Sequence, residues 1–315
     1  MIIDKWPRPQ KENGSLQDLS RREFIGGMAG VAAVAMLPSS SSIQAAVTPL
    51  AGATVNLLSY GVGNYLKAAN IYNGYVGLPL ATTIQKIYMA NGVLGTQPPV
   101  KMTQLAAAGC QFMVDVRPSK TMTPAEQSRL AKFLAALTSS GMSYRILLYS
   151  ECNNQAFSTP EQWQAYWSYY APVIKDAGVA CGYDPGCSYY SISRAETFFP
   201  SNPTPDELWM DYYATSFRSG SRVDTLMAMA EAVGVPIGLA EWGWAAGNTT
   251  LTPMIMPWWN EYCTYLIRLA SAKKLTLGTI YFGSAVNHAK TDVIGSSSDP
   301  RIPMIRNIAN AVQAA

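Results

Sequence analysis

The chain has 315 residues, of which 49% are hydrophobic and only 14% are charged, a composition that excludes a disordered chain, a coiled coil and a small disulfide scaffold. Its 23 basic and 20 acidic residues give a net charge of +3, so no basic surface points to a nucleic-acid partner. Five cysteines and a single histidine form neither a disulfide framework nor a histidine-rich metal site, and we expect no metal and no cofactor.

The N-terminal segment has the features of an export signal. Ser20-Arg21-Arg22-Glu23-Phe24-Ile25 leads into an uncharged run that ends at Leu37 and is too short to span a bilayer. This pattern resembles a twin-arginine signal, which directs folded proteins to the twin-arginine export machinery. Small residues between positions 45 and 53 offer several cleavage points, and we assign residues 1–46 to the signal and linker. The alternative is a buried amphipathic helix, although the run has no polar face.

The segment 47–315 contains a repeated strand pattern and no second stretch long enough to span a membrane. Short runs of β-branched and aromatic residues recur at the spacing of βα units. We predict eight strands: Thr54–Tyr60, Thr83–Met89, Gln111–Arg117, Tyr144–Ser150, Gly178–Asp184, Leu208–Tyr213, Val235–Glu241 and Leu275–Phe282.

Helix signals lie between these runs. Thr123 and Thr159 each precede a proline and are predicted N-caps of helices that end near Thr138 and Asp176. Eight such units match the size of a (β/α)₈ TIM barrel, so we predict one α/β domain over 47–315. The alternative is a doubly wound open sheet, whose glycine fingerprint is incomplete in Gly61-Val62-Gly63-Asn64.

Two predicted strands end in a glutamate. Glu151 follows Tyr144–Ser150, and Glu241 closes Val235–Glu241. Since a buried carboxylate is costly and the C-terminal ends of barrel strands form the reaction face, we interpret both as catalytic. Retaining glycoside hydrolysis requires two carboxyl groups ~5–5.5 Å apart. The competing interpretation is a pair of structural carboxylates in salt bridges.

These two positions, at the fourth and seventh strands, resemble the retaining glycoside hydrolases of clan A. The resemblance implies that Glu151 is the acid/base and Glu241 the nucleophile. The sequence departs from it at Ser150, where many clan members have Asn or His. It also implies that a tyrosine at the end of the sixth strand, Tyr213 or Tyr212, contacts the nucleophile.

Polar and aromatic residues near the predicted strand ends are candidates for binding sugar, because aromatic faces pack against the C–H faces of sugar rings. Arg117, at the end of the third strand, either binds substrate, holds a carboxylate or caps the loop before Pro118. The full set of predicted substrate-binding residues is Arg117, Asn153, Asn154, Tyr213, Trp242, Trp244 and Tyr281.

The sequence therefore predicts a secreted or extracytoplasmic, monomeric glycosidase that cleaves glycosidic bonds of an oligo- or polysaccharide by double displacement. No nucleic acid or membrane partner is expected after signal removal. The alternatives are a non-catalytic carbohydrate-binding barrel and an acyl hydrolase with a hydroxyl nucleophile. Cys181 and Cys187 bracket a tight loop in which a disulfide is possible.

Overall fold

A computed structural model describes residues 53–56, 74, 77, 84–89, 94–95, 97–186, 192–214, 223–244, 255–271, 278–282 and 298–314. All of these residues belong to the compact unit Ala46–Ala315. The predicted export signal, the segment Gly61–Asn64 and Cys187 lie outside the described residues.

Each of the eight predicted strands has a counterpart in one parallel sheet. Its hydrogen-bonded order is β1-β8-β7-β6-β5-β4-β3-β2, so neighbours in the sheet follow the chain order except where β1 joins β8. A doubly wound sheet reverses its strand order at an interior point, and that alternative is therefore wrong. The strands are β1 (Ala53–Asn56), β2 (Ile84–Met89), β3 (Gln111–Val116), β4 (Tyr144–Leu148), β5 (Cys181–Tyr183), β6 (Glu207–Ala214), β7 (Ile237–Trp244) and β8 (Gly278–Phe282).

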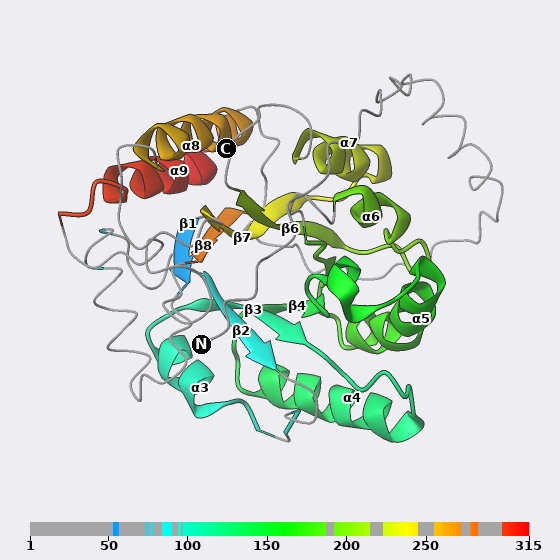
Figure 1. Cartoon of the computed structure of the whole chain (residues 1–315). Coiled ribbons are helices and arrows are strands. Elements are labelled where there is room, and N and C mark those ends of the chain that lie inside the picture. The colour runs from blue at the N-terminus through cyan, green and yellow to red at the C-terminus, as the bar shows by residue number, and fades with distance from the viewer. Residues whose placement is uncertain are drawn as a thin grey trace, which may run out of the picture. The chain divides into compact units, whose positions relative to one another are not determined.

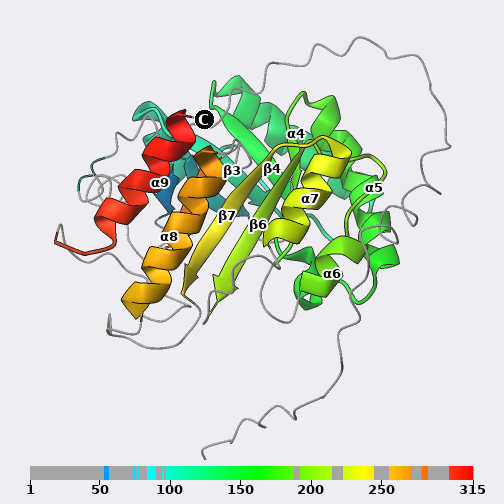
Figure 2. The same cartoon turned by 90° about the horizontal axis from the view of Figure 1, so that it is seen from above.

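Helices cover the outer face of the curled sheet (Figure 1). Thr123 and Thr159 are the N-caps of α4 and α5, as predicted, and each side chain accepts a hydrogen bond from a backbone amide of the first turn. The helices α8 and α9 lie side by side in both views (Figures 1 and 2). The helices are α3 (Val100–Ala107), α4 (Pro124–Ser139), α5 (Pro160–Asp176), α6 (Ile192–Thr197), α7 (Val223–Val233), α8 (Ile255–Ser271) and α9 (Ile302–Ala314), with a π-helical turn η2 (Cys152–Ala156).

Alternate residues of the strands supply two separate apolar cores. The larger one fills the space between the sheet and the helices. The smaller one lies on the other face and contains Ile84, Met113, Leu147, Trp209 and Ala240, contributed by five strands. Packing there is so close that a Cβ on Gly182 would lie 2.8 Å from Leu147 Cδ2, which explains the glycine in β5.

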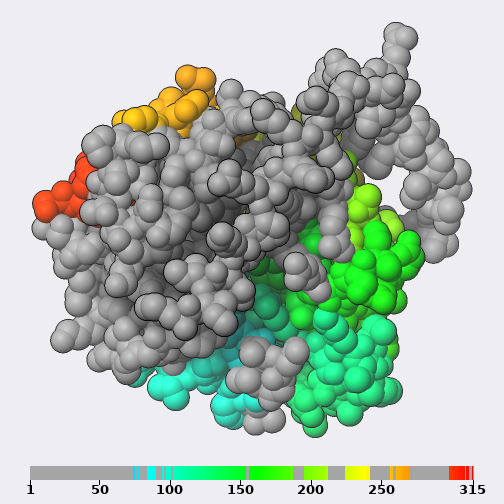
Figure 3. Space-filling view, viewed as in Figure 1, coloured from blue at the N-terminus to red at the C-terminus, as the bar shows by residue number. Residues whose placement is uncertain are grey.

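The outer faces of α4 and α5 contribute to the surface seen in Figure 3, where they are coloured green. Among the described residues, no helix combines the length and apolar character needed to cross a bilayer.

Candidate functional site

A buried lysine lies at the centre of a cluster of carboxylates inside the curled sheet. The ammonium nitrogen of Lys86 on β2 is 2.7 Å from Glu241 Oε1, 3.1 Å from Asp184 Oδ2 and 3.2 Å from Asp211 Oδ1. The side chain of Lys86 is 0% exposed and that of Glu241 is 7% exposed. One cation therefore faces three acidic groups that come from three different parts of the sheet.

An irregularity in the pairing of β6 and β7 explains how Glu241 reaches this cluster. Met210 pairs with Leu239, but the next pair is Asp211 with Glu241, so Ala240 has no partner of its own. Leu239 belongs to the larger core, between the sheet and the helices, whereas Ala240 belongs to the smaller core on the opposite, inner face of the sheet. In a regular strand Glu241 would point to the same side as Leu239. The bulge turns Glu241 inward beside Asp211, as bulges near functional sites commonly do.

Glu151 lies in a tightly held turn after β4. Tyr149 and Glu151 have φ angles of 58° and 55°, a left-handed conformation that is costly for residues other than glycine. The π-helical turn η2 follows at once, and such turns are frequent at functional sites.

Neighbouring strands hold each backbone amide of this turn. The amide of Tyr149 donates to the carbonyl of Val116 at 2.9 Å, and that of Ser150 donates to Asp115 Oδ1 at 3.1 Å. The amide of Glu151 donates to the carbonyl of Asp184 at 2.7 Å. These bonds offset the cost of the left-handed backbone and fix the position at which the Glu151 side chain leaves the turn.

The same end of the sheet carries both glutamates. Glu151 is bonded to the segment after β5, and Gly186 in that segment bridges to Asp211 on β6. Asp211 in turn pairs with Glu241 on β7. The negative charge of Glu151 also acts on Asp211, where it contributes to a raised pKa. Backbone pairing and electrostatics thus connect the Glu151 turn to Glu241 through Asp211.

Burial and crowding of charge change the proton affinities in the cluster. Burial by itself lowers the pKa of Lys86, but Asp184, Asp211, Glu241 and, from farther away, Asp115 raise it well above its usual range. Burial, followed by the charge of Asp184, raises the pKa of Asp211 well above its usual range despite the attraction of Lys86. Lys86 therefore stays charged, and Asp211 binds a proton more tightly than an exposed aspartate does.

Arg117 lies beside the Glu151 turn and holds a carboxylate, one of its three predicted roles. Its Nε and Nη2 atoms lie 2.9 and 2.7 Å from Asp115 Oδ2, and its guanidinium lies over the ring of Tyr149, 5.1 Å from the centroid. Burial lowers the pKa of Arg117, but Asp115, Tyr149 and Glu151 together raise it. With its side chain 32% exposed, Arg117 remains accessible from solvent.

Asn153 is committed to the backbone of the neighbouring segment. Its Nδ2 donates to the carbonyl of Gly186 at 2.9 Å, and its Oδ1 accepts from the amide of Gly186 at 2.8 Å. Asn153 is 1% exposed, so these contacts give it a bracing role within the protein.

The other predicted sugar-binding residues are described through their backbones alone. In the backbone pairing of β6 with β7, Tyr213 pairs with Gly243. In the pairing of β7 with β8, Trp242 pairs with Tyr281. The positions whose side chains lie outside the described part are Asn154, Tyr213, Trp242, Trp244 and Tyr281.

Sequence reasoning missed Lys86, Asp115 and Asp184, which the structure brings to the same region. The signal that could have identified Lys86 and Asp115 is a charged residue inside a short apolar strand, as in IQKIYM and QFMVDV. A charge at an inward position of such a strand needs a partner, which points to a polar cluster within the sheet.

Neither Cys152 nor Cys181, the two described cysteines considered from the sequence, provides a reactive thiolate or is held in a disulfide. Cys181 is a free, buried thiol in the structure, so the possible pairing with Cys187 finds no support. Cys152, next to Glu151, is fully buried, and burial raises the pKa of its thiol well above the usual range. A reactive thiolate is therefore disfavoured at this position.

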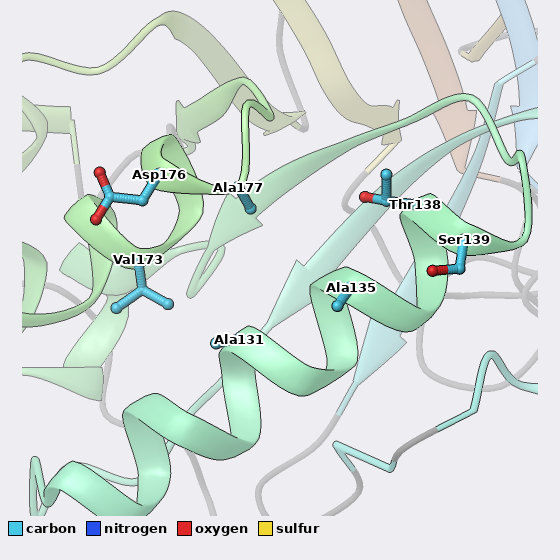
Figure 4. A pocket seen from close by; sticks show the side chains of 7 residues that line it. All are labelled: Ala131, Ala135, Thr138, Ser139, Val173, Asp176 and Ala177. Carbon is cyan, nitrogen blue, oxygen red and sulfur yellow. The ribbon is translucent and has the colours of Figure 1, made fainter.

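A cavity of about 510 Å³ lies elsewhere, between α4 and α5 (Figure 4). Its lining includes Ala131, Ala135 and Thr138 from α4 and Val173 and Asp176 from α5. The C-terminal ends of these helices lead to the N-terminal ends of β4 and β5, whereas Glu151 follows the C-terminal end of β4. The cavity is therefore separate from the carboxylate cluster. Within the described residues, no group of three or more His, Cys, Asp or Glu side chains is arranged to hold a metal.

Comparison with known proteins identifies the fold. No protein-family model matches the chain, and no curated protein matches it by sequence. The structure of a GH128 (subgroup II) endo-β-1,3-glucanase from Sorangium cellulosum aligns with 84% of this chain and 100% of its own, at 14% identity and a TM-score of 0.54. The corresponding enzyme from Pseudomonas viridiflava aligns with 81% and 96%, at 13% identity and a TM-score of 0.52.

A second type of enzyme has a similar fold. The catalytic domain of a GH26 endo-β-1,4-mannanase from Bacillus sp. JAMB-750 aligns with 82% of this chain and 84% of its own, at 12% identity and a TM-score of 0.55. At such low identities the likeness is one of fold. The chain has a parallel α/β sheet with outer helices similar to those of TIM-barrel glycoside hydrolases.

Proposed function

We propose that the protein is a retaining glycoside hydrolase in which Glu241 is the nucleophile and Glu151 the acid/base. The observation that carries the proposal is the connection of both glutamates to one buried network at the C-terminal end of the sheet, through Asp184, Asp211 and Lys86. In α/β barrels this end forms the reaction face. The names of the fold neighbours agree with this class of activity.

The reaction follows from the different surroundings of the two groups. Glu241 attacks the anomeric carbon and forms a glycosyl ester, while Glu151 transfers its proton to the departing glycosidic oxygen. In the second step Glu151 removes a proton from water, which attacks the same carbon and releases Glu241 as a carboxylate. Lys86, 2.7 Å from Glu241, stabilises the negative charge of this carboxylate before attack and after release.

The substrate is proposed to be a β-linked oligo- or polysaccharide, in accordance with the glucan and mannan named for the neighbours. Arg117, adjacent to the Glu151 turn and with its side chain 32% exposed, supplies a guanidinium to a sugar ring. The remaining proposed contacts come from Asn154, Tyr213, Trp242, Trp244 and Tyr281.

The full architecture belongs to the same proposal. Contact between β1 and β2, the two ends of the hydrogen-bonded strand order, supports closure of the sheet into a (β/α)₈ barrel. Residues 1–46 are proposed to be a twin-arginine signal, so that the monomeric domain 47–315 acts outside the cytoplasm. Replacing Arg21 and Arg22 by lysine should retain the protein in the cytoplasm, as fractionation and immunoblotting would reveal; continued export would refute the signal.

Activity is tested with the purified full chain on activated aryl β-glycosides, β-1,3-glucan and β-1,4-mannan. Glu241→Gln keeps the shape of the side chain but removes the nucleophile, so hydrolysis should fall to background. The matched control is Glu207→Gln, which changes a buried glutamate on β6 outside the cluster and should retain turnover. Hydrolysis by Glu241→Gln at the wild-type rate would refute the assignment. Product NMR should show retention of the anomeric configuration.

A binding protein without activity is the second candidate. The low exposure of Glu241 and its ion pair with Lys86 also suit a structural carboxylate. In that case the wild-type protein would retain a β-glucan or β-mannan in affinity electrophoresis but release no reducing ends. Binding and release together favour the enzyme.

A further inference from the structure

The three acidic contacts of Lys86 are not explained by stabilisation of Glu241 alone. Lys86 is fully buried, and its ammonium group has three N–H donors for its three carboxylate partners. One carboxylate would satisfy the charge at a lower cost of desolvation, because each further buried carboxylate repels the others. Asp184 and Asp211 thus weaken the fold electrostatically unless they also serve the site.

Both additional acids are tied to the turn that carries Glu151. The carbonyl of Asp184 accepts the amide of Glu151 at 2.7 Å. Asp211 donates its amide to Pro185 at 3.3 Å and bridges to Gly186, the residue clamped by the amide group of Asn153. A continuous path of bonds therefore runs from Glu241 through Lys86 to the backbone of Glu151.

We propose that Lys86, Asp184 and Asp211 are positioning residues that set the separation between the carboxyl groups of Glu241 and Glu151. This inference rests on the proposed function, in which that separation decides whether the reaction retains or inverts configuration. The compact ammonium holds Glu241 from one side, and the two aspartates transmit its position to the Glu151 turn. None of the three residues needs to touch the sugar.

The network also keeps its geometry during the reaction. When Glu241 becomes an ester it loses its negative charge, but Lys86 still contacts Asp184 and Asp211, and the charge of Asp115 still acts on it. Lys86 therefore remains charged and in place while Glu151 activates water. A lysine bound to Glu241 alone would lose its partner at this stage.

Replacement of Lys86 by methionine tests the network through the kinetics of aryl glycoside hydrolysis. We expect kcat to fall ~10²-fold with little change in KM, because a displacement of about 1 Å from the reactive geometry has an effect of this size. Unchanged kcat would refute the proposal.

Lys86→Arg separates positioning from charge alone. The planar, larger guanidinium cannot present three compact donors to the same carboxylates, so kcat should remain low although the positive charge is restored. Recovery of the wild-type kcat would overturn the positioning role. Glu207→Gln, the matched buried variant on β6, should retain the wild-type kcat and pH profile, which separates a local effect from general destabilisation.

Crystal structures of the wild-type and Lys86→Met proteins decide the question independently of activity. The distance between the carboxyl groups of Glu151 and Glu241 should change by about 1 Å or more; an unchanged distance would refute the proposal. If Lys86→Met does not fold, the isosteric Asp184→Asn and Asp211→Asn variants are judged by the same distance and by kcat. A wild-type protein without hydrolytic activity would refute the proposed function, and the measured distance would still decide the positioning role.

Discussion

Two buried ion clusters occupy the inner face of the same sheet, and they differ in charge balance. Near the N-terminal ends of the strands, Arg145 Nη1 lies 2.8 Å from Glu207 Oε1, and the indole of Trp209 donates to Glu207 Oε2 at 2.8 Å. One cation there meets one carboxylate. Towards the C-terminal ends, Lys86 meets three carboxylates. Along the strands, the apolar layer that contains Leu147 and Trp209 lies between the two ion clusters.

The difference indicates a structural role for the first cluster and a functional role for the second. The pair at Arg145 balances one cation with one carboxylate and favours one arrangement of β4 and β6, although burial still lowers the pKa of Arg145 and raises that of Glu207. An excess of acid around Lys86 opposes folding, and such local conflicts are typical of functional sites. The left-handed backbone of Tyr149 and Glu151 at the same end of the sheet agrees with this distinction.

The largest expected effect comes from Glu151. In Glu151→Ala, hydrolysis of substrates with poor leaving groups should fall ~10²–10⁴-fold, because the proton donor is lost. Activated aryl glycosides should still form the glycosyl ester, and added azide should accelerate turnover by attacking it and yielding a glycosyl azide. Steady-state kinetics with a series of aryl leaving groups measures this, and equal losses for every leaving group without azide rescue would contradict the acid/base role.

Glu207 provides the corresponding test at the other cluster. Glu207→Gln should lower the free energy of unfolding by ~3–5 kcal/mol, because Arg145 is left as an unpaired buried charge. Its kcat on any substrate should equal that of the wild type. Denaturant titration and kinetics on the same preparation measure both quantities. A large loss of kcat without a loss of stability would eliminate the distinction between the clusters.

The layer between the clusters should be sensitive to small changes in volume. Gly182→Ala places a methyl group 2.8 Å from Leu147 and 3.0 Å from Trp209, so the unfolding free energy should fall by ~1–3 kcal/mol. Gly178→Ala is a useful comparison, since its added Cβ would meet no atom within 4 Å and only its positive φ opposes the change. Equal stability of Gly182→Ala and the wild type, measured by denaturant titration, would show that the layer yields to added volume.

The sequence predicted the parts of the molecule that depend on local patterns. Alternation and spacing located the eight strands, and Thr123 and Thr159 marked the starts of α4 and α5. These features depend on residues near one another in the sequence, so a single chain is sufficient to identify them. The prediction that a glutamate ends each of two strands was wrong in its bounds, because β4 ends at Leu148, before Glu151, and β7 continues past Glu241 to Trp244.

The carboxylate cluster could not be predicted in the same way because it depends on register. Lys86 and Asp184 are separated by 98 positions, and their contact follows from the curvature of the sheet. The bulge that turns Glu241 inward leaves no clear trace in IGLAEWGW, where regular alternation would place Glu241 on the side of Leu239. The sequence likewise left Arg117 with three possible roles, and only its contact with Asp115 identified the carboxylate it holds.

The pH dependence of stability gives the smallest and most specific test. The pKa of Asp211 is raised on folding, so its contribution to stability is fully present below ~4, the value in the unfolded chain, and is lost as the pH rises through the folded value. Asp211→Asn removes this titration. The unfolding free energy of the variant relative to the wild type should therefore increase between pH 4 and 8, with a slope of at most ~1.4 kcal/mol per pH unit for one proton.

Glu207→Gln should show the same sign with a smaller increase. Burial raises the pKa of Glu207 with Arg145 opposing it, whereas the pKa of Asp211 is raised well above its usual range by burial and by the charge of Asp184. Asp184 and Asp211 share their titration, so Asp184→Asn should remove part of the same dependence. Denaturant titrations at several pH values measure all three variants. A pH-independent difference for Asp211→Asn would mean that the acids around Lys86 are no more strained than the pair at Arg145, and the contrast between the two clusters would then rest on catalysis alone.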